Sequence, residues 1–205
     1  MIESLNKADR QAVAQLISDK YHHFVRRPSS TPEEQQRAIH LIIRRFNPEQ
    51  SFSVRRNGKI VGFAVVETSE YPHALDIPYA SIRKEFSYFK SLLFWIALRI
   101  YRSRKIEIDE YTARVEILLV DRNHRRQGVA TELLEKIQEF AHEEGKTSLT
   151  LEVPEDDIEA HTFFNKVGFT TLSYRQLTQF FHRLVLPTAP TKTFQLCYPL
   201  DDSEE

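Results

Sequence analysis

"ILLVDRNHRRQGVATELLEKI", residues 117–137, joins an apolar run, a basic loop, a glycine and an amphipathic pattern. The apolar run belongs to "TARVEILLV" (112–120), whose β-branched and aliphatic residues predict a buried strand. After Gly128, apolar residues recur every three or four positions, which predicts a helix over 128–143. The stretch therefore predicts a strand, a loop and a helix in direct succession.

The turn before this helix has the chemistry of an anion-binding site. The first N–H groups of a helix have no partner inside it, and the helix dipole adds partial positive charge there. Gly128 lets the backbone approach an anion closely, and Arg125 and Arg126 add positive charge. A solvated basic turn is the alternative interpretation. Rossmann and P-loop sites are excluded, because the chain has neither GxGxxG nor GxxxxGK followed by Ser or Thr.

The composition is that of a globular protein. The chain has 205 residues, 28% charged and 41% hydrophobic, which suits one domain. Its formal net charge of -1 argues against a nucleic-acid partner, because general nucleic-acid binders carry a basic excess. Cys197 is the only cysteine, which excludes an internal disulfide or a thiolate metal cluster. With no signal-peptide pattern at the N-terminus, we expect a cytoplasmic protein without a metal.

Periodicity and turn signals organise the rest of the chain. Asn57-Gly58 predicts a hairpin between "SFSVRR" and "KIVGFAVVE". The other expected elements are helices over 7–20, 32–46, 81–103 and 156–167, strands over 147–153, 169–175 and 193–200, and a loop over 71–80. Together they predict one α/β domain over 1–200, with a mixed central sheet flanked by helices, and an acidic frayed tail at 201–205.

Several of these segments resemble a known family. "RRQGVA" (125–130) fits the [Q/R]-x-x-G-x-[G/A] signature of the GNAT superfamily, the acetyl-CoA-dependent N-acetyltransferases. "LTLEV" followed by "AHTFFNKVGF" resembles that family's next strand and helix, and "NGKIVGFAVV" is similar to its hairpin. The resemblance is close over 111–175 and weak over 67–110. We interpret 67–110 as an inserted loop and apolar helix before the cofactor-binding strand.

The resemblance implies a donor, an acceptor and a binding site. The donor is acetyl-CoA, and the acceptor is a primary amine of a small molecule, protein or peptide. The diphosphate of CoA is expected on the loop formed by Arg125, Arg126, Gln127, Gly128, Val129 and Ala130. The pantetheine arm is expected to pair with the backbone of Leu118, Leu119 and Val120, near Asp157. Asp157 replaces an asparagine that is common in the family.

Two glutamates are candidates for the base that removes a proton from the amine. Glu152 is the first, because it matches a strand glutamate used as the base in some members. Glu116 is the second, because a carboxylate among apolar neighbours has a raised pKa. Each could instead be an ordinary ion-paired or solvent-facing residue. Phe164 occupies the position of the family's usual tyrosine acid, which leaves a catalytically impaired acyl-CoA-binding sensor as the alternative function.

The helix predicted over 81–103 is apolar on more than one side. Its expected stripe comprises Ile82, Phe86, Phe89, Leu93, Ile96 and Ile100. The uninterrupted apolar run is only 92–98, whereas a membrane span needs about 20 residues, so we expect no stable membrane insertion. The second apolar side predicts a roof over the acceptor pocket or a homodimer contact, and burial within the monomer is the alternative. We interpret Trp95 and Tyr111 as core aromatics.

Overall fold

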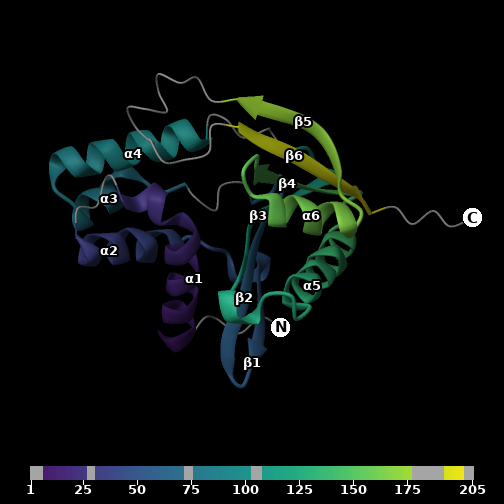
Figure 1. Ribbon diagram of the computed structural model, residues 1–205. Coiled ribbons are helices and arrows are strands. Elements are labelled where there is room, and N and C mark those ends of the chain that lie inside the picture. The colour runs from purple at the N-terminus through teal and green to yellow at the C-terminus, as the bar shows by residue number, and fades with distance from the viewer. Residues whose placement is uncertain (1–6, 27–30, 72–75, 103–107, 177–191, 201–205) are drawn as a thin grey trace, which may run out of the picture.

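The computed structural model describes residues 7–26, 31–71, 76–102, 108–176 and 192–200. Within these residues, six strands form one mixed sheet in the order β1-β2-β3-β4-β6-β5 (Figure 1). Of these six strands, β3 and β4 are parallel neighbours, and the other pairs are antiparallel. The strands are β1 Ser51–Arg56, β2 Lys59–Glu67, β3 Thr112–Val120, β4 Ser148–Pro154, β5 Thr170–Gln176 and β6 Lys192–Pro199. The predicted α/β class, mixed sheet and hairpin are confirmed.

Helices cover both faces of the sheet. Helices α1 to α4 lie on one side in Figure 1, and α5 and α6 lie on the other. Their bounds are α1 Lys7–Arg26, α2 Pro32–Ile43, α3 Tyr79–Glu85, α4 Tyr88–Arg102, α5 Val129–Glu143 and α6 Ile158–Lys166, with short 3-10 turns η1 Pro48–Gln50 and η2 Arg122–His124. Among the described residues, no helix is both long and apolar enough to cross a membrane.

Each face has its own hydrophobic core. Helices α1 to α4 pack on Phe63 and Val65 of β2 and on Ile117 and Leu119 of β3. Helices α5 and α6 pack on the opposite side of β1 to β4 and on β6. On β4 the odd-numbered residues Leu149, Leu151 and Val153 face this second core. The even-numbered residues of β4 therefore face the α1–α4 side, because successive side chains of a strand alternate.

The apolar segment after β2 forms two helices, so the prediction of one helix over 81–103 is wrong. Phe86 has extended backbone angles (φ −131, ψ 158) and separates α3 from α4. The Ser91 hydroxyl donates to the Phe86 carbonyl at 3.2 Å, which helps to satisfy the end of α3. The break changes the helical phase, so Phe89 and Leu93 are exposed. The buried stripe of α4 is instead Ser91, Phe94, Ala97 and Leu98.

Other differences concern the ends of elements. Helix α1 continues to Arg26 beyond the expected end at residue 20, and α2 ends at Ile43 before the expected residue 46. Helix α3 begins at Tyr79, inside the loop expected over 71–80, of which 72–75 lie outside the described residues. The expected tail at 201–205 also lies outside them. Tyr111 is 57% exposed, so its prediction as a core aromatic is wrong, whereas Trp95 is partly buried against the first core.

Candidate active site

The loop between β3 and α5 has the backbone geometry of an anion site. Gly128 is the residue before α5 and has a φ of 78, and Arg126 has a φ of 60. Left-handed residues in such a turn direct successive N–H groups into one concavity, which binds anions. The Gln127 side chain donates to the Asn123 carbonyl at 3.0 Å and closes the loop. The loop thus presents the free N–H groups of α5 without rearrangement.

Close packing fixes the start of α5 against the sheet. A Cβ added to Gly62 of β2 would lie 2.6 Å from Cγ1 of Val129, the first residue of α5. Gly62 pairs with Val120, the last residue of β3. The same glycine therefore sits beside both ends of the loop. The absence of its side chain lets α5 approach the sheet closely.

The two arginines of the loop contact α6. Glu159 in the first turn of α6 is 3.1 Å from Nη2 of Arg126 and 3.4 Å from Nη1 of Arg125. All three side chains are about half or more exposed to solvent. An exposed ion pair of this kind is weak and is easily replaced by another anion. The arginines are therefore available to a bound phosphate group.

Strand β3 is paired with β4 over only part of its length. The parallel ladder joins Thr112–Val115 to Ser148–Leu151, and β4 beyond Leu151 pairs with β6 alone. Glu116 is an extra residue on β3, because the register with β2 passes from Val65↔Ile117 to Val66↔Val115. Such a bulge bends a strand and increases its twist. Within the described residues, β3 after Val115 therefore has an open backbone edge on its β4 side, including Leu118, Leu119 and Val120.

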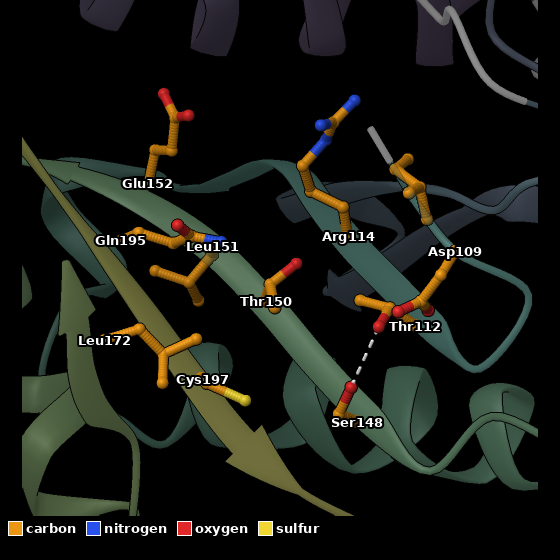
Figure 2. A pocket seen from close by; sticks show the side chains of 11 residues that line it. Asp109, Thr112, Arg114, Ser148, Thr150, Leu151, Glu152, Leu172, Gln195 and Cys197 are labelled. Carbon is orange, nitrogen blue, oxygen red and sulfur yellow. Dashed lines mark hydrogen bonds between the residues drawn. The ribbon is translucent and has the colours of Figure 1, made fainter. Parts of the chain in front are cut away.

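A cavity of about 210 Å³ lies beside the point where β3 and β4 separate (Figure 2). It opens on the α1–α4 side of the sheet, since Thr150 and Glu152 project there from β4 and Arg114 from β3. Its lining residues are Ile108, Asp109, Thr112, Arg114, Ser148, Thr150, Leu151, Glu152, Leu172, Gln195 and Cys197. The last β3–β4 pair, Val115↔Leu151, is adjacent to two of the charged residues, Arg114 and Glu152.

Arg114, which lines the cavity, contacts two buried carboxylates. The Arg114 guanidinium donates a hydrogen bond to Glu67 across the β2–β3 pair, and its Nε lies 3.8 Å from Oε2 of Glu116. The Glu67 and Glu116 side chains are 1% and 3% exposed. Two buried carboxylates therefore lie beside the Arg114 guanidinium and offset its charge. Removing one partner from such a buried group is costly.

The two candidate bases occupy different environments. Glu152 is exposed and lines the cavity. The Glu116 side chain is buried beside Arg114 and is not among the cavity-lining residues. A base must come within hydrogen-bond reach of the proton that it removes. The geometry therefore favours Glu152 over Glu116.

Asp157 and Phe164 on the α6 side have clear structural roles. The Asp157 carboxylate caps α6 by accepting from the Ala160 N–H at 3.2 Å. Phe164 is buried, and its ring packs on those of Phe163 and Phe169 at 5.1 and 5.3 Å. Neither residue offers a proton donor that a leaving thiolate could use at neutral pH.

Sequence reasoning missed most of the cavity. Asp109, Arg114, Thr150 and Gln195 were not expected to share a site. The alternation of polar Ser148, Thr150 and Glu152 in β4 is a signal that could have shown its polar face. Cys197 is half-buried and lines the cavity, and burial raises the pKa of its thiol. Among the described residues, no three His, Cys, Asp or Glu side chains are grouped to hold a metal.

Comparisons with known proteins agree with this architecture. The family model "Acetyltransferase (GNAT) family" matches residues 11–169. A search of curated protein sequences finds no significant match. Similar solved structures include the ribosomal-protein-S18-alanine N-acetyltransferase of Escherichia coli, with a TM-score of 0.54 and 16% identity over 100% of this chain and 96% of that chain.

Two further solved structures are similar to this chain over most of its length. One is described as an acetyltransferase and has a TM-score of 0.60 at 15% identity, over 98% of this chain and 100% of that chain. The other is Ard1 of Thermoplasma volcanium, with a TM-score of 0.52 at 20% identity, over 92% of this chain and 94% of that chain. At these identities the structural similarity establishes the fold, and the family rests on the matched sequence.

Proposed function

This chain belongs to the GNAT family of acetyltransferases, and on that premise we propose that it transfers the acetyl group of acetyl-CoA to a primary amine. The proposed catalytic domain spans 1–200, and 67–110, which contains α3 and α4, is an insertion before β3. One observation carries the proposal. The open edge of β3 leads directly into a left-handed loop that begins a helix at Gly128.

The donor fits these two features. The diphosphate would contact the N–H groups of Gly128, Val129 and Ala130, with Arg125 and Arg126 as counter-charges and Gln127 holding the loop. The pantetheine arm would add to the open edge at Leu118, Leu119 and Val120 as a short extra strand. A donor held in this way places its thioester near the point where β3 and β4 separate, which is also where the cavity begins.

The acceptor would enter from the cavity on the α1–α4 side. An ammonium group first loses one proton, and Glu152 is placed to take it, directly or through water. The amine nitrogen then attacks the thioester carbon, and an N–H group on the open β3 edge can stabilise the negative oxygen. The carbon–sulfur bond breaks, the nitrogen loses its second proton, and the thiolate gains one. Because Phe164 carries no acidic proton, water relays this second proton from the nitrogen to the thiolate.

The direct test combines donor binding with turnover. Calorimetry measures the affinity for CoA, and release of free thiol from acetyl-CoA across a panel of amines measures transfer. We expect binding by the intact protein, loss of most of that binding in R125A/R126A, and thiol release that depends on an added amine. If CoA gives no binding heat and the double variant behaves identically, the proposal is wrong.

A second candidate function follows from Phe164. A chain that binds acyl-CoA but lacks a proton donor near the thiolate could act as a sensor or an interaction protein. Tight CoA binding without turnover for any amine would favour this function.

The cytoplasmic location and the homodimer remain predictions. None of the described α4 side chains lines the cavity, so the dimer contact is the proposed role for the exposed Tyr88, Phe89 and Leu93.

A further inference from the structure

The cavity beside β3 and β4 carries a carboxylate at each end. Glu152 stands at the end where the two strands separate. Asp109 stands at the opposite end, beside the Thr112–Ser148 pair, whose hydroxyl groups lie 3.1 Å apart (Figure 2). The proposed reaction uses only the Glu152 end. Asp109 therefore has no role in the chemistry described so far.

The turn before β3 fixes the position of Asp109. Its Oδ1 accepts from the Tyr111 N–H at 3.1 Å, and its carbonyl accepts from the Thr112 N–H at 3.5 Å. Ser148 and Glu152 are four residues apart on β4, and a strand rises about 3.3 Å per residue, so the backbone positions at the two ends of the cavity are about 13 Å apart. Carboxylates that stand at these two ends suit two linked cationic groups better than one small cation.

The rest of the lining adds no uncompensated positive charge. Arg114 is paired with Glu67 and lies beside Glu116, so its charge is already offset from within the protein. The neutral polar lining is formed by Thr112, Ser148, Thr150 and Gln195, whose oxygen atoms can accept hydrogen bonds. An ammonium or a protonated secondary amine therefore meets acceptors among these residues, and the apolar lining residues Ile108, Leu151 and Leu172 suit the methylene chain between two charged groups.

The size of the cavity limits the shape of its occupant. Its volume of about 210 Å³ is below the range of roughly 300–1,000 Å³ that is typical of drug-sized ligands. Because its lining residues span about 13 Å along β4, so small a volume leaves a narrow space. It suits an unbranched chain better than a ring system.

We infer that the acceptor is a slender dicationic amine, that is, a linear diamine or polyamine. Its reacting nitrogen lies beside Glu152, and its second ammonium group is bound by Asp109. This inference rests on the proposed acetyl transfer, and it specifies the acceptor for the same site.

The test compares matched amines in the thiol-release assay. Linear α,ω-diamines of increasing length are compared with the monoamines of the same chain length, and spermidine is added as a longer cation. We expect kcat/KM per primary amine group to be about twofold to fivefold higher for the longer diamines than for their monoamines, which is typical of one exposed ion pair. The preference should be smallest for diamines too short to reach both carboxylates.

Asp109→Asn connects the preference to its proposed cause. The asparagine keeps a side-chain oxygen that can accept from Tyr111, so the turn is retained while the negative charge is lost. We expect the diamine-to-monoamine ratio of kcat/KM to fall close to one. Glu110→Gln is the matched control, because Glu110 is an exposed neighbour that does not line the cavity. It should keep the ratio of the unmodified protein.

The outcomes separate this inference from the proposed function. Acetylation of monoamines and diamines with equal kcat/KM, or an unchanged ratio in D109N, would overturn the dicationic acceptor and leave acetyl transfer standing. A higher kcat/KM for a lysine-containing tetrapeptide than for any diamine would also overturn it. CoA binding without turnover of any amine would overturn both.

Discussion

Oε1 of Glu159 lies 3.1 Å from Nη2 of Arg126. A carboxylate of α6 is thus ion-paired with an arginine that we propose binds the donor diphosphate. The same carboxylate also reaches Arg125. Donor binding must then replace one anion by another. The protein's own glutamate competes with its proposed ligand.

Glu159→Gln should therefore strengthen donor binding. We expect the affinity for CoA at low salt to rise about twofold to fivefold, because the exposed ion pair with the arginines is removed. The gain should shrink in 0.5 M salt, which screens exposed charges. Calorimetry at two salt concentrations measures both effects. Glu155→Gln is the control, because Glu155 pairs with Lys192 instead of the loop. Weaker CoA binding by E159Q would contradict the competition.

Gly128 and Gly145 form a matched pair for the donor loop. Both have left-handed angles, with φ of 78 and 67, and a Cβ at either position would meet no atom within 4 Å. Alanine at either site should lower the free energy of unfolding by about 1 kcal/mol, because a side chain is strained in this conformation. Only G128A should also weaken CoA binding, and G128E should abolish it. Equal CoA affinities for G128A and G145A would argue against a diphosphate at Gly128.

Glu152→Gln and Glu116→Gln should separate catalysis from stability. E152Q should bind CoA normally but slow thiol release about 100-fold, within the range of general-base catalysis. E116Q should lower the free energy of unfolding by about 1–3 kcal/mol, because Arg114 loses a buried charged neighbour. Denaturation in urea and single-turnover rates distinguish the two effects. Normal turnover by E152Q would move the assignment of the base to Glu116.

Glu70 should contribute to stability in a pH-dependent way. Backbone hydrogen bonding at Glu70, followed by hydrogen bonds from Thr68 and Lys146, lowers its pKa from 4.5 to about 2. Since the folded pKa is the lower one, the contribution is present above pH 4.5 and is lost as the pH falls toward 2. The difference in urea midpoint between the unmodified protein and Glu70→Gln should therefore shrink over this interval. Glu139→Gln, on the exposed side of α5, is the control.

Sequence patterns were sufficient where one local rule decides the structure. Asn57-Gly58 sets the hairpin, and Gly128 marks the start of α5, because each needs a backbone conformation that glycine or asparagine adopts readily. The apolar segment over 81–103 was misread because periodicity assumes an unbroken helix. The break at Phe86 is accompanied by a hydrogen bond from Ser91 to the Phe86 carbonyl, a contact that periodicity does not encode.

The cavity could not be predicted from local sequence patterns, because it depends on which strands pair and in which register. Asp109 and Glu152 are 43 positions apart and share a cavity only because β3 and β4 are parallel neighbours in a fixed register. Glu116 was expected on a regular strand, whereas it is the extra residue of a bulge that also opens the strand edge. Register shifts of this kind arise from packing on both faces of the sheet.

The contact between Gly62 and Val129 should couple stability to donor binding. An alanine at Gly62 would place its Cβ 2.6 Å from Cγ1 of Val129, which is closer than atoms can pack. We expect G62A to lower the free energy of unfolding by about 1–3 kcal/mol, as overpacking does, and to push the start of α5 away from the sheet. CoA affinity should fall with it, because the N–H groups at that helix end would move.

Val129→Ala supplies the matched rescue. Alone it removes buried methyl groups and should itself lower stability. In G62A/V129A the new methyl group takes the space vacated by Cγ1, so the double variant should be more stable than the sum of the single losses by about 1 kcal/mol or more. Urea denaturation of the unmodified protein, G62A, V129A and G62A/V129A measures this coupling. Calorimetry shows whether the double variant also regains the CoA affinity that G62A loses. Additive losses would mean that G62A acts elsewhere, and that the close approach of α5 to β2 does not hold the donor loop in place.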